Sequence, residues 1–202
     1  MYKSEHGQDK WLNENVFKNK NHGVFVEIGA YNGVDYSNSY FYENILSWSG
    51  IIIEPIPEHC EHARKHRKCK VIEAAIDTQD GEGILSVVPN CKGWSGLTKS
   101  IEEKHWQRIK DHGFEKYEIK VKTKNINNIL FENGIKKIDY MSIDVEGNEG
   151  MILKSINFDE YEIDVIEVET NFAPGIYHNF MIEKGYVPLE RLGVNDIYWR
   201  AS

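Results

Sequence analysis

The sequence predicts an α/β fold built on a mostly parallel sheet with helices on both faces. Along most of the 202 residues, apolar runs of strand length alternate with longer segments of helical period. Hydrophobic residues make up 41% of the chain, which allows one sizeable core in a chain too short for two ordinary domains. We therefore expect a single domain over residues 1–202.

Predicted strands and helices alternate along the chain as expected for a parallel sheet. Seven apolar segments have strand length, at 24–28, 50–54, 70–75, 138–143, 163–169, 186–190 and 196–200. Five segments have helical period, at 35–47, 58–66, 125–133, 149–156 and 178–184. Only a short turn separates the last two strands, so we expect them to pair as an antiparallel hairpin.

An insert at residues 81–124 interrupts this alternation. Residues 84–88 and 117–121 alternate apolar and polar side chains, which is typical of antiparallel strands with one solvated face. We expect these strands to lie against the edge of the sheet. The insert is also a place where substrate specificity could reside.

Charge and cysteine content limit the function classes. The net charge of -8 argues against binding to nucleic acid, because phosphate backbones are held by clustered Lys and Arg. The cysteines number 3 and include no CxxC pair, so neither a disulfide framework nor a zinc knuckle is indicated. The sequence also contains no apolar leader and no membrane span, and we expect a cytoplasmic protein.

The first strand runs into a glycine turn that suits a ligand. Glu27 ends the strand region, and Gly29 and Gly33 follow it. Glycine lets the backbone approach a cofactor without a Cβ in the way, and open parallel sheets bind ligands at this point. The three glycines of a dinucleotide fingerprint are missing, and a carboxylate at Glu27 would repel a pyrophosphate.

Acids and small residues follow the next two strands. Glu54 and Pro55 close the second strand, in the position from which a carboxylate accepts hydrogen bonds from ribose hydroxyls. Ala75, Ile76 and Asp77 follow the third strand. The first two of these could face an adenine ring while Asp77 reaches its amine.

The fourth strand ends in the most specific pattern of the chain. Asp144 and Glu146 leave its carboxyl end just before a glycine and a helix start, and Glu149 opens that helix. Like charges at close range and burial both raise the pKa of a carboxyl group, so one of these acids could act as a general base near neutral pH. The alternative is structural, with Asp144 as a helix cap and Glu149 as a first-turn acid.

These segments together resemble the FkbM-type methyltransferases that use S-adenosylmethionine (SAM). The resemblance is carried by Phe25-Val26-Glu27-Ile28-Gly29-Ala30, by Ser37-Asn38-Ser39, by Trp48 to Pro55, by Gly7-Gln8-Asp9 and most specifically by Ser142 to Glu149. It covers nearly the whole chain. It departs at residues 89–117, where only Trp94-Ser95-Gly96-Leu97 corresponds.

The resemblance implies a class I, Rossmann-like methyltransferase fold with strand order 3-2-1-4-5-7-6 and an antiparallel seventh strand. It implies O-methylation of a sugar or polyketide hydroxyl, and a deoxysugar such as rhamnose is a plausible acceptor. The implied SAM contacts are Glu27, Gly29, Ala30 and Asn32 around the methionine portion, Ser37 and Asn38 at the start of the next helix, Glu54 and Pro55 at the ribose, Ala75, Ile76 and Asp77 at the adenine, and Asp144 near the methyl group.

Methyl transfer to a hydroxyl needs a base, and several side chains are candidates. Asp144 and Glu146 come first, with Glu169 at the end of the fifth strand and His178 after a Pro-Gly turn. Alternatively, Asp144 and Glu169 could hold Mg²⁺ or Mn²⁺, because hard cations prefer oxygen ligands. Four aromatic residues could stack on a sugar or simply pack in the core: Trp94, Trp106, Phe172 and Tyr177.

Three alternatives belong to other classes. A cofactor-binding module without catalysis would need Glu27, Gly29 and Glu54 but neither Asp144 nor Glu146. An NAD-dependent dehydrogenase is disfavoured by the missing third glycine. An interaction protein on the same fold is the third alternative. The sequence does not predict an oligomeric state.

Overall fold

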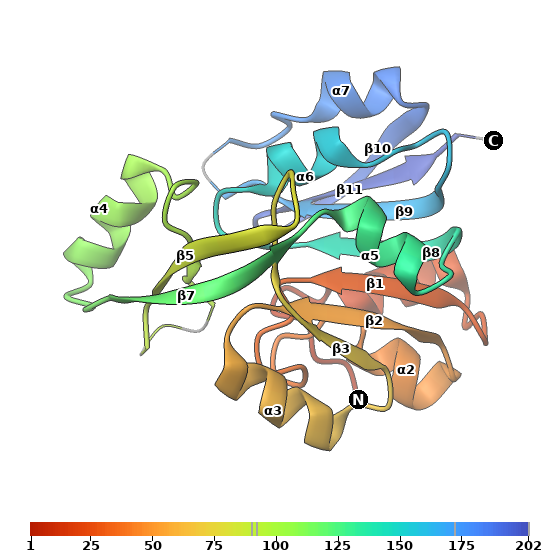
Figure 1. Cartoon of the computed structure of the whole chain (residues 1–202). Helices are drawn as coiled ribbons and strands as arrows, with labels where there is room; N and C mark the ends of the chain where they lie inside the picture. Colours follow the sequence, from red (N-terminus) through yellow and green to blue (C-terminus); the bar gives the residue numbers. More distant parts are fainter. Residues whose placement is uncertain (90, 92, 172, 202) are drawn as a thin grey trace.

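The computed structural model describes residues 1–89, 91, 93–171 and 173–201, and is built around a sheet of 7 strands (Figure 1). The strand order is β10-β11-β9-β8-β1-β2-β3. Adjacent strands are parallel from β3 to β9, and β11 is antiparallel to both of its neighbours. This confirms the predicted order and the C-terminal hairpin. The strands are β1 Val24–Ile28, β2 Ser49–Glu54, β3 Lys70–Glu73, β8 Lys137–Ile143, β9 Glu162–Glu169, β10 Tyr186–Leu192 and β11 Asn195–Arg200.

The central strands are mainly apolar because both faces of the sheet are covered. Side chains alternate between two cores: Phe25 packs on one face of β1 and Val26 on the other. One core is closed by α5 Ile126–Glu132, α6 Glu149–Ser155 and α7 His178–Glu183. The other is closed by α1 Gln8–Leu12, the π-helical turn Asn13–Phe17, α2 Tyr40–Leu46 and α3 Pro57–His66.

The insert forms a second sheet of 4 strands in the order β4-β7-β5-β6. Its strands are β4 Ala75–Ile76, β5 Gly81–Val87, β6 Gly96–Leu97 and β7 Tyr117–Lys124, and β5 pairs antiparallel with β7. The two predicted strands are therefore antiparallel but longer than expected. Between β6 and β7 runs α4 Glu103–Asp111, which projects from the central sheet in Figure 1.

Two predicted boundaries are wrong, for physical reasons that involve the site. The helix predicted at 35–47 begins only at Tyr40, because Ser37, Asn38 and Ser39 are held in a turn by hydrogen bonds to Glu27. The strand predicted at 70–75 ends at Glu73, and residues 75–76 pair instead with β7. Both shifts bring polar or small residues to the end of the sheet.

Across the described residues, none of the helices is both long and apolar enough to span a bilayer.

Candidate active site

A cavity of about 520 Å³ opens at the carboxyl ends of β1, β2, β8 and β9. This is the edge at which open α/β sheets bind ligands, and the volume is in the range of small-molecule sites. The insert closes the side of the cavity away from the central sheet, through residues 93–97 and the end of α4.

Most of the predicted site residues line this cavity. They are Glu27, Gly29, Ala30, Asn38, Glu54, Pro55, Ala75, Ile76, Asp144, Glu146 and Glu169. Four others do not line it: Asn32, Ser37, Asp77 and His178.

The glycine turn joins the ends of three strands at very short range. The amide of Gly29 donates to Ile53 O at 2.9 Å, and the amide of Asp144 donates to Ile28 O at 3.0 Å. Gly29 has φ +83°, and a Cβ built on it would lie 1.6 Å from the carbonyl oxygen of Asp144. Only glycine satisfies both the left-handed conformation and the close approach.

Glu27 holds the chain segment after this turn. Its carboxylate accepts hydrogen bonds from Ser37 Oγ at 2.8 Å, from the Asn38 amide at 2.8 Å and from Ser39 Oγ at 2.5 Å. Ser37 donates its hydroxyl hydrogen to Glu27, while its oxygen accepts from the Tyr40 amide at 3.1 Å at the start of α2. Only 3% of Glu27 is exposed, and its contacts fix the position of the segment that follows the glycine turn.

Arg67 completes this network, and its role was missed from the sequence. The guanidinium is buried, with Nε 2.6 Å from Glu43 Oε2 and its terminal nitrogens donating to Gly33 O at 2.8 Å and Ser39 Oγ at 2.8 Å. It lies in a basic run that looked like a solvated helix face. The only sequence signal is that it follows the last turn of α3, where its side chain can turn inward.

Asn38 lines the cavity and has one side-chain acceptor without a partner among the described residues. Its Nδ2 donates to Ser142 Oγ at 2.9 Å, while its Oδ1 is buried and has no hydrogen-bond partner among the described residues. A buried polar atom without a partner is costly. A donor group on a ligand, such as an ammonium, would satisfy it.

Glu54 closes β2 and faces the same cavity. Its Oε2 accepts from the Tyr31 amide at 3.0 Å, and its Oε1 accepts from the Ile56 amide at 3.0 Å and lies 3.3 Å from His59 Nδ1. These contacts fix the carboxylate at the strand end. Each oxygen has more than one lone pair, so the group can also accept from hydroxyls.

The predicted adenine region is divided between the cavity and the insert. Ala75 and Ile76 line the cavity, but Asp77 binds Lys99 Nζ at 2.5 Å and faces away. Asn148 lines the cavity near this region, and its Nδ2 donates to Ile76 O at 3.0 Å. Asn32 folds back on its own turn, accepting from the amides of Val34 and Asp35 at 3.0 and 2.9 Å.

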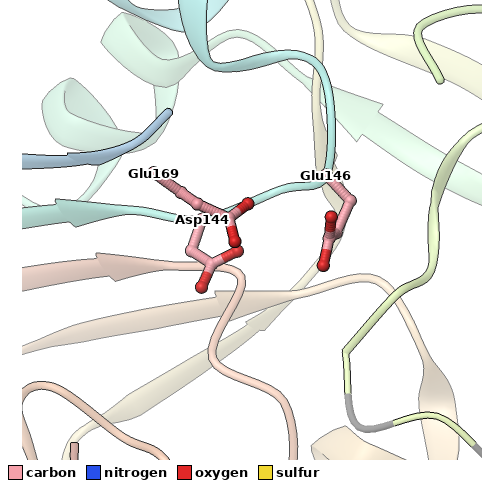
Figure 2. A group of neighbouring side chains, drawn as sticks. All are labelled: Asp144, Glu146 and Glu169. Atoms are coloured by element: carbon pink, nitrogen blue, oxygen red, sulfur yellow. The ribbon is translucent and has the colours of Figure 1, made fainter. Parts of the chain in front are cut away.

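Three carboxyl groups converge at the ends of β8 and β9. Asp144, Glu146 and Glu169 each offer an oxygen, and these oxygens lie within 4.8 Å of one another (Figure 2). Burial raises the pKa of Asp144 to about 7, with Glu149 adding to the effect. Burial and the neighbouring acids also raise the pKa of Glu146 and of Glu169 well above the ordinary value. All three pKa shifts favour the protonated form of these carboxyl groups.

Glu149 and His178 are each held by contacts within the protein. Glu149 accepts from the amides of Val145 and Gly147 at 3.1 and 3.0 Å, so the structural alternative holds for this acid. It does not hold for Asp144, because Asn148 is the N-cap residue of α6. His178 Nδ1 lies 2.8 Å from the hydroxyl of Tyr198.

The insert contributes a buried histidine that sequence reasoning missed. His105 Nδ1 lies 3.2 Å from Glu146 Oε2, and its Nε2 lies 3.2 Å from Trp94 O. Because a carbonyl only accepts, Nε2 carries a proton, and Nδ1 faces the carboxyl group of Glu146. Burial lowers the pKa of His105. No local motif marks this residue, since its partner lies 41 positions along the chain in the printed sequence.

The predicted aromatic residues have different surroundings. Trp94 lines the cavity, but Arg108 covers its ring at 3.8 Å. Trp106 packs under Lys116 at 3.8 Å, and Tyr177 packs on Gly150. Phe172 lies outside the described residues.

Comparison with known proteins identifies the family and similar folds. The Methyltransferase FkbM domain family matches residues 27–188. A methyltransferase structure from Geobacter sulfurreducens superposes with TM-score 0.52 at 11% identity, over 96% of this chain and 78% of that one. The METTL16 methyltransferase domain gives 0.50 at 9% identity, over 95% and 65%. A methyltransferase from Pyrococcus furiosus gives 0.48 at 11%, over 96% and 81%. No curated protein gives a significant sequence match. The family match spans most of the sequence, and the chain therefore belongs to the FkbM family of SAM-dependent methyltransferases.

Proposed function

We propose that this methyltransferase acts as a single domain that transfers the methyl group of SAM to a hydroxyl of a sugar or glycan, with a deoxysugar such as rhamnose as a plausible acceptor. The observation that carries the proposal is the group of three carboxyls, Asp144, Glu146 and Glu169, which face the cavity beside the glycine turn. Hydroxyl acceptors are poor nucleophiles until their proton leaves, and this group supplies proton acceptors at the required place.

The other side of the cavity suits the cofactor. Gly29 leaves room for close contact, and the unpaired Oδ1 of Asn38 suits the ammonium of the methionine portion. The Glu54 carboxylate suits the ribose hydroxyls. Ala75 and Ile76 offer small or apolar surface for the adenine.

In the proposed reaction, the cavity residues position the acceptor and remove its proton. Bound SAM supplies an electrophilic methyl group on a sulfonium. The acceptor oxygen forms its bond to that carbon as the carbon–sulfur bond breaks, and the hydroxyl proton passes to Asp144. A pKa of about 7 keeps part of the Asp144 population ionised at neutral pH and still basic enough to accept the proton. Glu169 and Glu146 lie beside Asp144 and influence its protonation through their charges.

A second arrangement uses the same acids as ligands for Mg²⁺ or Mn²⁺. Asp144 and Glu169 would hold the cation, which would orient the acceptor hydroxyls and lower their pKa. It is favoured by the Oε2 of Glu169, which is buried without a partner in the described part of the chain. Exhaustive chelation separates the two arrangements: activity survives it unchanged if the carboxyls act alone, and is lost if they act through the cation.

The acceptor is tested directly with isotope-labelled SAM. The protein is incubated with glycans containing rhamnose, fucose and other deoxysugars, and mass spectrometry locates the label. We expect the label on a sugar hydroxyl oxygen. Label only on polyketide or other small-molecule hydroxyls would replace the sugar by that acceptor class, and SAM binding without any transfer would favour a non-catalytic protein. Calorimetric titration with SAM, its demethylated product S-adenosylhomocysteine (SAH) and NAD tests the cofactor assignment.

A further inference from the structure

One cation faces the cavity from the insert. Arg108 lies on α4 and stacks over the ring of Trp94 at 3.8 Å, and both residues line the cavity. Stacking occupies the flat face of a guanidinium and leaves its N–H groups free in the plane. Trp94 therefore holds Arg108 in a fixed orientation with its hydrogen-bond donors available.

These donors have no protein acceptor in the described ranges. Arg64, Arg67 and Arg191 each have a carboxylate oxygen within 3.0 Å, whereas no ion pair or side-chain hydrogen bond joins Arg108 to any described residue. Arg108 is also the sole Lys or Arg among the described residues that line the cavity. Arg108 attracts Glu146 through its charge, but its N–H groups have no hydrogen-bond acceptor among the described residues and are suited to an anion brought by a ligand.

The position of Arg108 relates it to the reacting groups. Three residues earlier on α4, His105 contacts Glu146 at 3.2 Å. Residues three apart lie on the same side of a helix, about one turn from each other. Arg108 is therefore about one helical turn from the residue that contacts the carboxyl cluster, and its charge opposes the rise in the pKa of Glu146.

We propose that Arg108 is the specificity residue of the acceptor subsite, and that the acceptor carries an oxyanion, a carboxylate or a phosphate, near the hydroxyl that is methylated. This inference rests on the proposed function. The planar fork of Arg108 binds two oxygens of such a group at once, which positions the neighbouring hydroxyl toward Asp144. Two kinds of sugar would bring such an anion. Uronic acids carry a carboxylate, and sugars linked to a nucleoside diphosphate carry phosphates.

The test measures binding of matched probes to the complex of the protein with SAH. Calorimetry compares methyl glucoside with methyl glucuronide, which differ by the carboxylate, and adds UDP-glucose as the phosphate arm. We expect at least one anionic probe to bind about 10-fold tighter than the neutral sugar, the scale of a charge-assisted hydrogen bond. In Arg108→Gln this advantage disappears, and in Arg108→Lys it is partly kept because the charge remains without the fork.

Arg64→Gln is the matched control, because Arg64 pairs with Glu73 and does not line the cavity. It should retain the full preference. The arm that loses its advantage in Arg108→Gln identifies the carboxylate or the phosphate as the source.

Three results would overturn the inference. They are equal or undetectable binding of charged and neutral probes to the wild type, an anionic advantage that persists in Arg108→Gln, and loss of SAH binding in both Arg108 variants, which would assign Arg108 to the cofactor. The proposed function fails separately, through absence of SAH binding or methyl transfer in the wild type.

Discussion

Replacing Gly29 by alanine tests whether the close approach of three strand ends shapes the cofactor side of the cavity. The new Cβ would lie 1.6 Å from the carbonyl oxygen of Asp144, so that oxygen would have to retreat by about 1.5 Å or more to reach normal contact. The left-handed φ of +83° adds a cost of about 1 kcal/mol for a residue with a Cβ. The shift also moves the carboxyl of Asp144, and a displacement of this size can lower a rate by about 100-fold.

Gly134→Ala is the matched control. Gly134 has φ +65°, and a Cβ there would meet nothing within 4 Å, so this variant isolates the backbone cost. Urea denaturation measures stability, and calorimetry measures the Kd of SAM. We expect Gly29→Ala to lose clearly more stability than Gly134→Ala and to bind SAM more weakly. Equal losses in the two variants, with normal SAM binding in Gly29→Ala, would refute the reasoning.

The remaining predictions concern buried charges. Arg67→Ala should destabilise the fold by about 3–5 kcal/mol in urea denaturation, because it leaves the carboxylate of Glu43 buried without its partner. Burial raises the pKa of Glu167 to about 8, so the folded state binds an extra proton above the unfolded pKa, and stability is lost as pH rises toward 8. Between pH 6 and pH 8, wild type should lose about 2 kcal/mol more than Glu167→Gln, and parallel curves would contradict this. His105→Ala should lower kcat while leaving the Kd of SAM unchanged, because it removes the partner of Glu146; an unchanged kcat would leave His105 with a packing role.

The sheet was predictable because its physical cause is local in the sequence. Strands buried on both faces are mainly apolar, as in β1 and β8, and the segments between them have helical period. The acids at strand ends were also predictable. Asp144 and Glu169 stand at the carboxyl ends of strands that are neighbours in the sheet, so the backbone alone brings them together.

The turn after β1 could not be predicted from propensity. Ser37 and Asn38 are typical residues at the start of a helix, and the sequence pattern places them there. In the structure Glu27 competes for their donors, which delays the helix to Tyr40. A long-range hydrogen bond outweighs a local preference in this segment.

The insert shows the same limit for the site. Asp77 looks like an adenine contact in sequence, yet Lys99 of the insert neutralises it. Arg108 lines the cavity, and His105 contacts Glu146 just after β8, because the fold brings α4 to this end of the central sheet. Nothing in the local pattern of α4 distinguishes these two side chains from solvated ones.

We propose that the cavity has a cofactor side, which includes Glu54, and a reacting side, which includes Asp144. One paired measurement tests this division. The Kd of SAM and the kcat for methyl transfer are measured for Asp144→Ala and Glu54→Ala. Asp144→Ala should abolish turnover while SAM still binds, because it removes the proton acceptor. Glu54→Ala should weaken SAM binding by about 10-fold and spare kcat at saturating SAM. The reverse pattern, with SAM binding lost in Asp144→Ala and turnover lost in Glu54→Ala, would contradict the account.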